Sequence, residues 1–445
     1  MRRTCTIPNE ILLDIFEYLE PFPGDLCNVI LTCRKWCTLA TPILYARVAL
    51  DSKLREDSPA ARFSQSYLHR GLVKACSIQI TQVHLMGFGI FSAEAFNRLT
   101  EICEVLPHLE KLRGFSLGFE KPVDQGFPAP SIAIVSILNS LPKTVLHLNL
   151  DCSSLGRPSL VQPHICQAIS AHIPRLRSLR LRASYLCSGL FSCLTSHATF
   201  EHDRDGETSP YMPTLPNAAS ALEHVVIRLD GHPQSPNGAN TCICYSGEVH
   251  LRGARLAKTL QNLYESGAFP ALQQFAVIGR VDAAPSPRND HWNAFKVRYL
   301  TRNAMNTMTY PWCARGGSSS LFMIRDFDGD WFGSFDQVTN ALEGPLAWME
   351  TGIGSCTRKN RLRNDTPNSW TLDHTQLDSR ESVIQKFGVS FRLWKLESTT
   401  GMKLLQARTS SGFDDVADVR QIVPMGWRWV PEGPRNWTIE PISAS

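Results

Sequence analysis

Residues 7–45 carry three short helical patterns that cannot close a core by themselves. In the first pattern, apolar residues recur at helical spacing from Ile11 onward. Prolines and a glycine within 21–24 end it, Asp25 is predicted to cap a second helix, and a third surrounds Trp36. A segment of about forty residues buries too little surface to be stable alone. Because apolar side chains nevertheless point in nearly every direction, part of this surface is predicted to meet another chain or another domain.

The order and spacing of these residues resemble the F-box pattern. The matching positions are Ile7-Pro8, Glu10, Ile11-Leu12, Phe16, Leu19, Asp25-Leu26, Leu31, Cys33-Arg34 and Trp36. The family usually begins Leu-Pro, so Ile7 is a mild departure. The run Ala40-Thr41-Pro42-Ile43-Leu44-Tyr45 is similar to the tail of fungal F-box proteins. The resemblance covers about a tenth of the 445 residues and implies an F-box at residues 5–50.

This resemblance implies a docking function. An F-box binds a Skp-type adaptor and, through it, a cullin–RING ubiquitin ligase. The residues carried over from the family pattern as adaptor-binding are Pro8, Ile11, Leu12, Ile15, Leu31 and Trp36. The chain would then be a substrate receptor of an SCF-type ligase that holds an unknown target protein and catalyses no reaction itself. A non-catalytic scaffold acting outside ubiquitin transfer is the alternative.

Composition narrows the class of protein. The chain is 43 % hydrophobic and 19 % charged, as in ordinary globular proteins, and its length predicts two to four domains. A net charge of +4 gives no general reason to expect nucleic acid or an anionic membrane as partner. No apolar run approaches the ~18 residues of a membrane span, and no secretion signal follows Arg2 and Arg3. We therefore expect an intracellular protein of the cytoplasm, the nucleus or both.

The sequence predicts no metal and no cofactor. Fourteen cysteines without a secretion signal indicate buried thiols, not a disulfide framework. The close pair Cys242 and Cys244 lacks the second pair or spaced histidines of a zinc site. Asp326, Asp328 and Asp330 alternate as in a calcium loop, but the required glycine and glutamate are missing further on. An enzyme using these three aspartates around a metal remains a third, weaker hypothesis.

From about residue 70 the chain repeats an apolar-x-x-apolar-x-apolar unit. The copies are Val145-x-x-Leu148-x-Leu150, Leu176-x-x-Leu179-x-Leu181, Leu222-x-x-Val225-x-Ile227 and Leu272-x-x-Phe275-x-Val277. Leu109-x-x-Leu112 begins a copy that Gly114 interrupts and that Phe115 and Leu117 complete out of register, and Ile78-x-Ile80 is a degenerate earlier one. Helical patterns at 132–141, 164–173 and 254–264 fill the gaps, with Pro142, Pro174 and Pro270 just before the strands.

Strand, crossover helix and strand at a loose period are typical of a stacked α/β solenoid. The pattern resembles leucine-rich repeats, although its period exceeds the roughly 20–29 residues usual for them. An ordinary doubly wound α/β domain is the alternative, and the two differ in whether the sheet curves open or closes over. Arg180 and Arg182 alternate with core leucines, so we expect them on the solvent-exposed, concave face. There they are possible target-binding residues, because arginine binds carboxylate and phosphate.

Beyond about residue 284 the composition changes. Nine of the ten tryptophans lie after residue 290, and residues 388–394 and 321–324 are strand-like. The chain contains none of the motifs of common nucleophilic, phosphate-binding or zinc-dependent enzymes. The predicted fold class is α/β. We expect a three-helix F-box (5–50), an irregular leucine-rich-repeat-like α/β solenoid (70–283) and a Trp-rich α+β C-terminal region (284–445).

Overall fold

The computed structural model divides into two units by internal contacts. One comprises Met1–Ser154 with Leu346–Thr366, and the other comprises Leu155–Pro345 with Pro367–Ser445. The structure describes residues 7–20, 22–52, 69–81, 93–120, 131–152, 165–183, 186, 188–194, 219–229, 260–282, 293–299, 307–313, 320–325, 330–333, 337, 378–387, 397–401, 427–431 and 437–442. The division into three regions predicted from the sequence stays a prediction.

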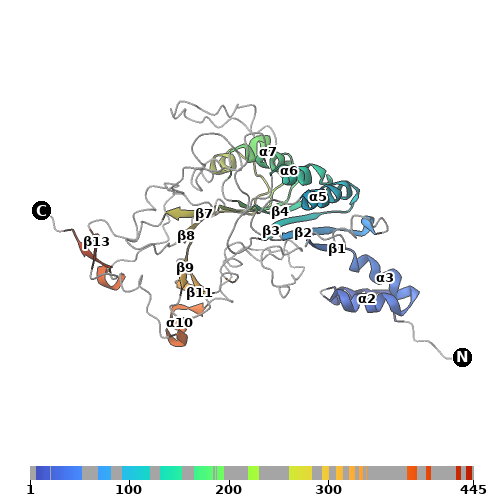
Figure 1. Cartoon of the computed structure of the whole chain (residues 1–445), viewed down its shortest axis with the longest axis horizontal. Coiled ribbons are helices and arrows are strands. Elements are labelled where there is room, and N and C mark those ends of the chain that lie inside the picture. Colours follow the sequence, from blue (N-terminus) through green and yellow to red (C-terminus); the bar gives the residue numbers. More distant parts are fainter. Residues whose placement is uncertain are drawn as a thin grey trace. The chain divides into compact units, whose positions relative to one another are not determined.

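Three helices open the chain, as the sequence predicts. They are α1 (Asn9–Tyr18), α2 (Pro23–Thr32) and α3 (Arg34–Leu44) (Figure 1). Pro8 precedes α1 and Pro23 opens α2, two positions where the missing N–H of proline costs no helical hydrogen bond. Asp25 therefore lies in the first turn of α2, and the prediction that it caps this helix is wrong because Phe22 occupies the N-cap.

The three helices share one small core. Leu12, Phe16, Leu26 and Ala40 are its buried residues, and half-buried apolar residues such as Trp36 and Leu39 pack around them. The rings of Phe16 and Trp36 meet edge to face, with centroids 5.7 Å apart. This geometry is favourable for aromatic pairs.

The rest of the first unit is a parallel sheet with helices packed on it. Its strands are β1 (Arg47–Ser52), β2 (Ala75–Thr81), β3 (Gly114–Glu120) and β4 (His147–Cys152), paired in that order. Helices α5 (Ala93–Val105) and α6 (Ser131–Ser140) lie side by side along one side of β2–β4 (Figure 1). The short 3-10 turns Arg70–Leu72 and Leu106–His108 lead into β2 and toward β3.

The register of these strands corrects the repeat pattern that the sequence suggests. Cys76 of β2 aligns with Phe115 of β3, and Phe115 aligns with Leu148 of β4. Leu112-x-x-Phe115-x-Leu117 is therefore an in-register copy, and the prediction that Gly114 interrupts it is wrong. The spacing also identifies Val73-x-x-Cys76-x-Ile78 as the earlier copy, in place of the one predicted around Ile80. All six of these apolar side chains are buried.

A backbone ladder repeats just before each of these strands. The carbonyl of Ala46 accepts hydrogen bonds from the N–H groups of Lys74 and Ala75. The Lys74 carbonyl does the same for Arg113 and Gly114, and the Arg113 carbonyl for Leu146 and His147. In the second unit the Arg177 carbonyl accepts from Glu223 and His224. Each of these strands thus begins in the same way: one carbonyl just before the preceding strand accepts the two backbone N–H groups that lead into the next strand.

The second unit begins with the same strand-and-helix pattern. It contains α7 (Ile165–Ser170), the 3-10 turns Ile173–Arg175 and Ser188–Leu194, and the parallel strands β5 (Ser178–Ala183), β6 (His224–Leu229) and β7 (Gln274–Asp282). The sequence predicts a helix at 254–264. Of this range the structure describes residues 260–264, which are helical, and the helix continues to residue 265. Phe191, Phe269 and Phe275 form an aromatic cluster with centroids 5.8–6.3 Å apart.

Pairing changes from parallel to antiparallel after β7. Strands β8 (Asn293–Tyr299), β9 (Thr307–Cys313), β10 (Ser320–Arg325), β11 (Asp330–Gly333) and β12 (Asp378–Ser379) pair in sequence, and β13 (Trp427–Pro431) pairs with β14 (Trp437–Pro441). The predicted strand at 321–324 is confirmed as β10, whereas the one at 388–394 lies outside the described residues. N-terminal helices followed by a parallel sheet with helices confirm the α/β class.

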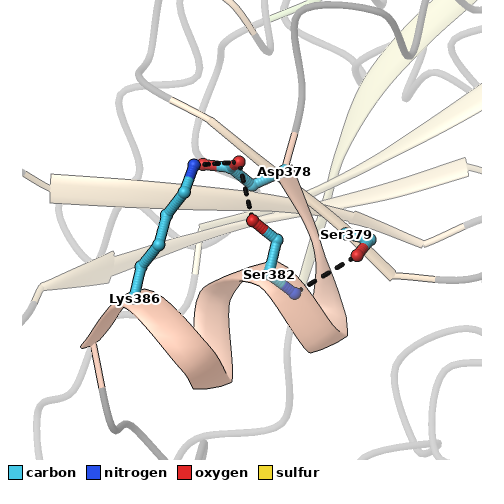
Figure 2. A network of polar contacts seen from close by, with 4 residues as sticks. All are labelled: Asp378, Ser379, Ser382 and Lys386. Atoms are coloured by element: carbon cyan, nitrogen blue, oxygen red, sulfur yellow. Dashed lines mark hydrogen bonds and ion pairs between the residues drawn. The ribbon is translucent and has the colours of Figure 1, made fainter.

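Helix α10 (Arg380–Phe387) is held to β12 by a small polar network (Figure 2). Ser379 Oγ accepts the backbone N–H of Ser382 at 3.3 Å and so caps the helix. Asp378 accepts the Ser382 hydroxyl at 3.0 Å and Lys386 Nζ at 2.5 Å. The hydrogen bond from Lys386 is the main cause that lowers the pKa of Asp378. The contacts join the two residues of β12 to the first and last turns of α10, so the network stabilises this helix locally.

Candidate functional site

Helix α1 presents three parallel stripes of different chemistry. Residues four and then three positions apart lie on one side of a helix, and each step of one residue turns by about 100°. Leu12, Phe16 and Leu19 form the stripe that faces the helical core. We call Ile11, Ile15 and Tyr18 the apolar stripe, and Glu10, Asp14 and Glu17 the acidic stripe. Both of these stripes are exposed.

The apolar stripe is a hydrophobic surface that the described parts of the chain do not cover. Ile11, Ile15 and Tyr18 are 50 %, 45 % and 79 % exposed. Other exposed apolar residues on the same three helices and their ends are Ile7, Phe22 and Leu31, the last being 83 % exposed. Six large apolar side chains exposed within 25 residues of sequence are unusual, because soluble proteins normally scatter such residues singly. This concentration marks a surface suited to a partner.

The structure divides the predicted adaptor-binding residues into two groups. Pro8, Ile11, Ile15 and Leu31 are exposed and available to a partner. Leu12 is only 3 % exposed and belongs to the internal core, so it is not available as a first contact for a partner.

Trp36 is half-buried against Phe16, so at least part of its ring serves the internal core too. Tyr18 and Phe22 are further exposed apolar residues of this surface that are not among the predicted adaptor-binding residues. Tyr18 could have been found from its spacing, because it follows Ile11 by seven positions and Ile15 by three.

The three-helix module is joined closely to the first strand. Glu20, just after α1, forms an ion pair with Arg47 of β1 at 2.9 Å, and both side chains are largely buried. The Tyr45 ring stacks on His69 with centroids 4.1 Å apart. Only Tyr45 and Ala46 separate α3 from β1, so the described chain has no long linker at this junction.

The predicted exposure of Arg180 and Arg182 is wrong. The two side chains are 2 % and 8 % exposed, and Arg228, in register with Arg182 on β6, is 6 % exposed. All six residues of β5 are buried, which means that both faces of this strand are covered. Alternation along a strand places residues on opposite faces but does not determine whether the second face is open to solvent. Neither arginine is therefore available as a first contact for a target.

The candidate metal sites considered from the sequence lie mostly outside the described residues. Asp330 begins β11, but Asp326 and Asp328 lie outside the described residues, as do Cys242 and Cys244. In the described part of the chain no cluster of three or more histidine, cysteine or acidic side chains is arranged to hold a metal. The cysteines described there are free thiols, and burial raises the pKa of Cys76 to about 12. None of the described helices is long and apolar enough to cross a membrane.

Comparison with known proteins agrees with the chemistry of the N-terminal helices. No curated protein matches the chain. The family model described as F-box-like matches residues 4–51, the segment that contains α1–α3 and all of β1 but its last residue. An F-box-like domain at this place supports an F-box protein, and in general an SCF-type adaptor role.

Proposed function

We propose that the chain is the substrate-recognition subunit of an SCF-type ubiquitin ligase. It docks through α1–α3 on a Skp-type adaptor and reaches a cullin–RING ligase through that adaptor. The observation that carries this proposal is the exposed apolar stripe on a module that matches the F-box-like family. The chain itself catalyses no step, acts inside the cell in the cytoplasm, the nucleus or both, and needs neither nucleic acid nor membrane.

The docking surface is centred on Ile11, Ile15 and Tyr18, with Pro8 and Leu31 as further contacts. These side chains are already exposed, so docking removes them from water without opening the internal core. An interface of ordinary specific size buries about 1,600 Å² in total, of which a few apolar anchors supply most of the free energy. Leu12 and Trp36 support this surface from inside.

The test measures adaptor binding by the full-length protein. Ile11→Glu with Ile15→Glu should weaken binding by well over about tenfold, or more than about 1.4 kcal/mol, because two charges enter an apolar contact. The matched control is Ile132→Glu on α6 of the same unit, where the isoleucine is 43 % exposed. Equal adaptor binding by wild type and the double variant would refute the docking site.

The target would bind the region of recurring strands or the Trp-rich C-terminal region. The aligned copies on β2–β4 and β5–β7, each entered through the same backbone ladder, support an irregular leucine-rich-repeat-like α/β solenoid. Proximity labelling with wild type and with the docking-deficient double variant would identify the target. A degradation target should accumulate on the double variant, because that variant holds it without delivering it to the ligase.

A scaffold outside ubiquitin transfer makes a different prediction. Such a protein would co-purify with the adaptor but without cullin, and loss of docking would leave the abundance of its partners unchanged. Cullin in the wild-type complex, together with a longer half-life of labelled proteins in the double variant, would favour the receptor.

A further inference from the structure

We infer that the acidic stripe of α1 selects and steers the docking partner, which must carry basic side chains along one margin of its apolar groove. This inference rests on the proposed docking function and adds the charge of the partner's surface to it. The juxtaposition that carries it is the acidic stripe lying one helical step beside the apolar stripe.

The geometry places the two stripes in a single contact surface. Glu10, Asp14 and Glu17 each precede a member of the apolar stripe by one residue. A step of one residue turns the helix by about 100°, so the acidic stripe borders the apolar stripe along the length of α1. The core stripe borders it on the opposite side, where α3 packs against α1. A partner bound to Ile11 and Ile15 therefore meets the carboxylates of the acidic stripe on one side only, which we call the outer margin of α1.

The three carboxylates are not used within the described structure. All three are exposed, and no ion pair joins any of them to a described cation. The nearby Glu20 is the residue paired with Arg47. Lys35 Nζ donates to the carbonyl of Ile7 at 3.1 Å, at the beginning of α1. Within the described part of the chain, the side of α1 that carries the acidic stripe is thus a row of three negative charges without an ion-pair partner.

Only one of these three acidic residues favours helix formation. Glu10 suits the first turn, where the helix dipole favours negative charge. Glu17 lies in the last turn, where the dipole disfavours it, and that turn has no basic residue. Asp14 lies four positions after Glu10 and three before Glu17, and like charges at these spacings repel. Two of the three acidic residues therefore oppose helix formation, which is understandable if a partner uses them.

The chemistry of the partner follows from this arrangement. An apolar groove receives Ile11 and Ile15, and lysine or arginine along its outer margin faces the acidic stripe. Charges at the rim of an interface act mainly on the association rate and on the rejection of wrong partners. Their effect is screened by salt, since the Debye length falls from about 10 Å at 0.1 M to about 3 Å at 1 M.

The experiment measures association and dissociation rates of the full-length protein with the purified Skp-type adaptor at about 0.03 M and about 0.5 M ionic strength. The charge-reversal variant is Glu10→Lys with Asp14→Lys and Glu17→Lys, and the neutral variant is Glu10→Gln with Asp14→Asn and Glu17→Gln. Glu104→Lys with Glu110→Lys is the control, because both glutamates are exposed in the same unit away from the helical module.

We expect the charge-reversal variant to associate at least about tenfold more slowly at low ionic strength, to approach wild type at high ionic strength, and to dissociate at nearly the wild-type rate. The neutral variant should fall between them and the control should match wild type. The stability of α1 should be nearly unchanged in the charge-reversal variant, because Glu10→Lys is unfavourable and Glu17→Lys favourable toward the helix dipole while three lysines repel as three carboxylates do. Hydrogen exchange measures this, so that slower binding is not confused with misfolding.

Three results would count against these proposals, and they can be told apart. Adaptor binding that depends on Ile11 and Ile15 but has the same association rate and salt dependence in all charge variants would overturn the role of the acidic stripe alone. Faster association of the charge-reversal variant would do the same, since the partner margin would then be acidic. Absence of adaptor binding by wild type would overturn the proposed function itself.

Discussion

Replacing Phe16 by alanine removes the largest side chain of the buried three-helix core. Phe16 is 1 % exposed and contacts Trp36 edge to face at 5.7 Å. Its neighbour Ile15, one residue earlier on the same helix, is 45 % exposed. The two positions therefore separate the internal function of α1 from its function as a docking surface.

The magnitudes decide what each substitution does. Phenylalanine to alanine in a core costs about 3–5 kcal/mol, including the cavity left behind. A module of roughly forty residues with a stability of about 0.05–0.15 kcal/mol per residue has only about 2–6 kcal/mol to lose. Phe16→Ala should therefore leave α1–α3 largely unfolded. Ile15→Ala, at an exposed position, should change stability by less than about 0.5 kcal/mol.

Hydrogen exchange followed by mass spectrometry measures this on the full-length protein. Backbone amides of α1, α2 and α3 should lose protection together in Phe16→Ala, because they share one core, while those of β5 and β6 keep theirs. Ile15→Ala should keep all protection and weaken adaptor binding. If Phe16→Ala exchanged like wild type across the three helices, the buried cluster would not be what holds them together, and the division of α1 into core and docking stripes would be refuted.

Three further results are expected. Gly114→Ala should leave the free energy of unfolding unchanged or raise it by up to about 1 kcal/mol, because the added Cβ has its nearest neighbour, a Cβ on β2, at 3.7 Å. The melting temperature measures this, and a clear drop would contradict the register. Cys76 should resist alkylation near pH 8 while the exposed Cys27 reacts, because burial raises the pKa of Cys76 to about 12; peptide mapping after iodoacetamide treatment measures this, and equal labelling would count against it. Helix α10 should exchange faster as pH falls below about 3.8, because the hydrogen bond from Lys386 lowers the pKa of Asp378, so its stabilising effect is complete above that pH and is lost on protonation. Exchange independent of pH between about 5 and 3, after correction for the intrinsic rate, would contradict it.

Most of the recurring strands could be predicted from the sequence pattern. The copies around Leu148, Leu179, Val225 and Phe275 all became strands because two apolar residues at alternate positions predict one buried face. The predicted register of the copy at Phe115 is wrong because a glycine inside the pattern resembles an interruption. A glycine adds no side chain to either face, so only pairing with β2 and β4 determines which residues align.

Local sequence is enough to predict three amphipathic helices followed by a series of strands, since helical and strand periodicities are local properties of the chain. It is also enough to predict that the helices carry more apolar surface than their own core can bury. Which stripe of α1 faces inward is not encoded locally, because two adjacent stripes are apolar and burial depends on how α2 and α3 pack against them. In the same way, alternation put Arg180 and Arg182 opposite the leucines, whereas their burial depends on what covers the second face of β5, a non-local contact that no local pattern encodes.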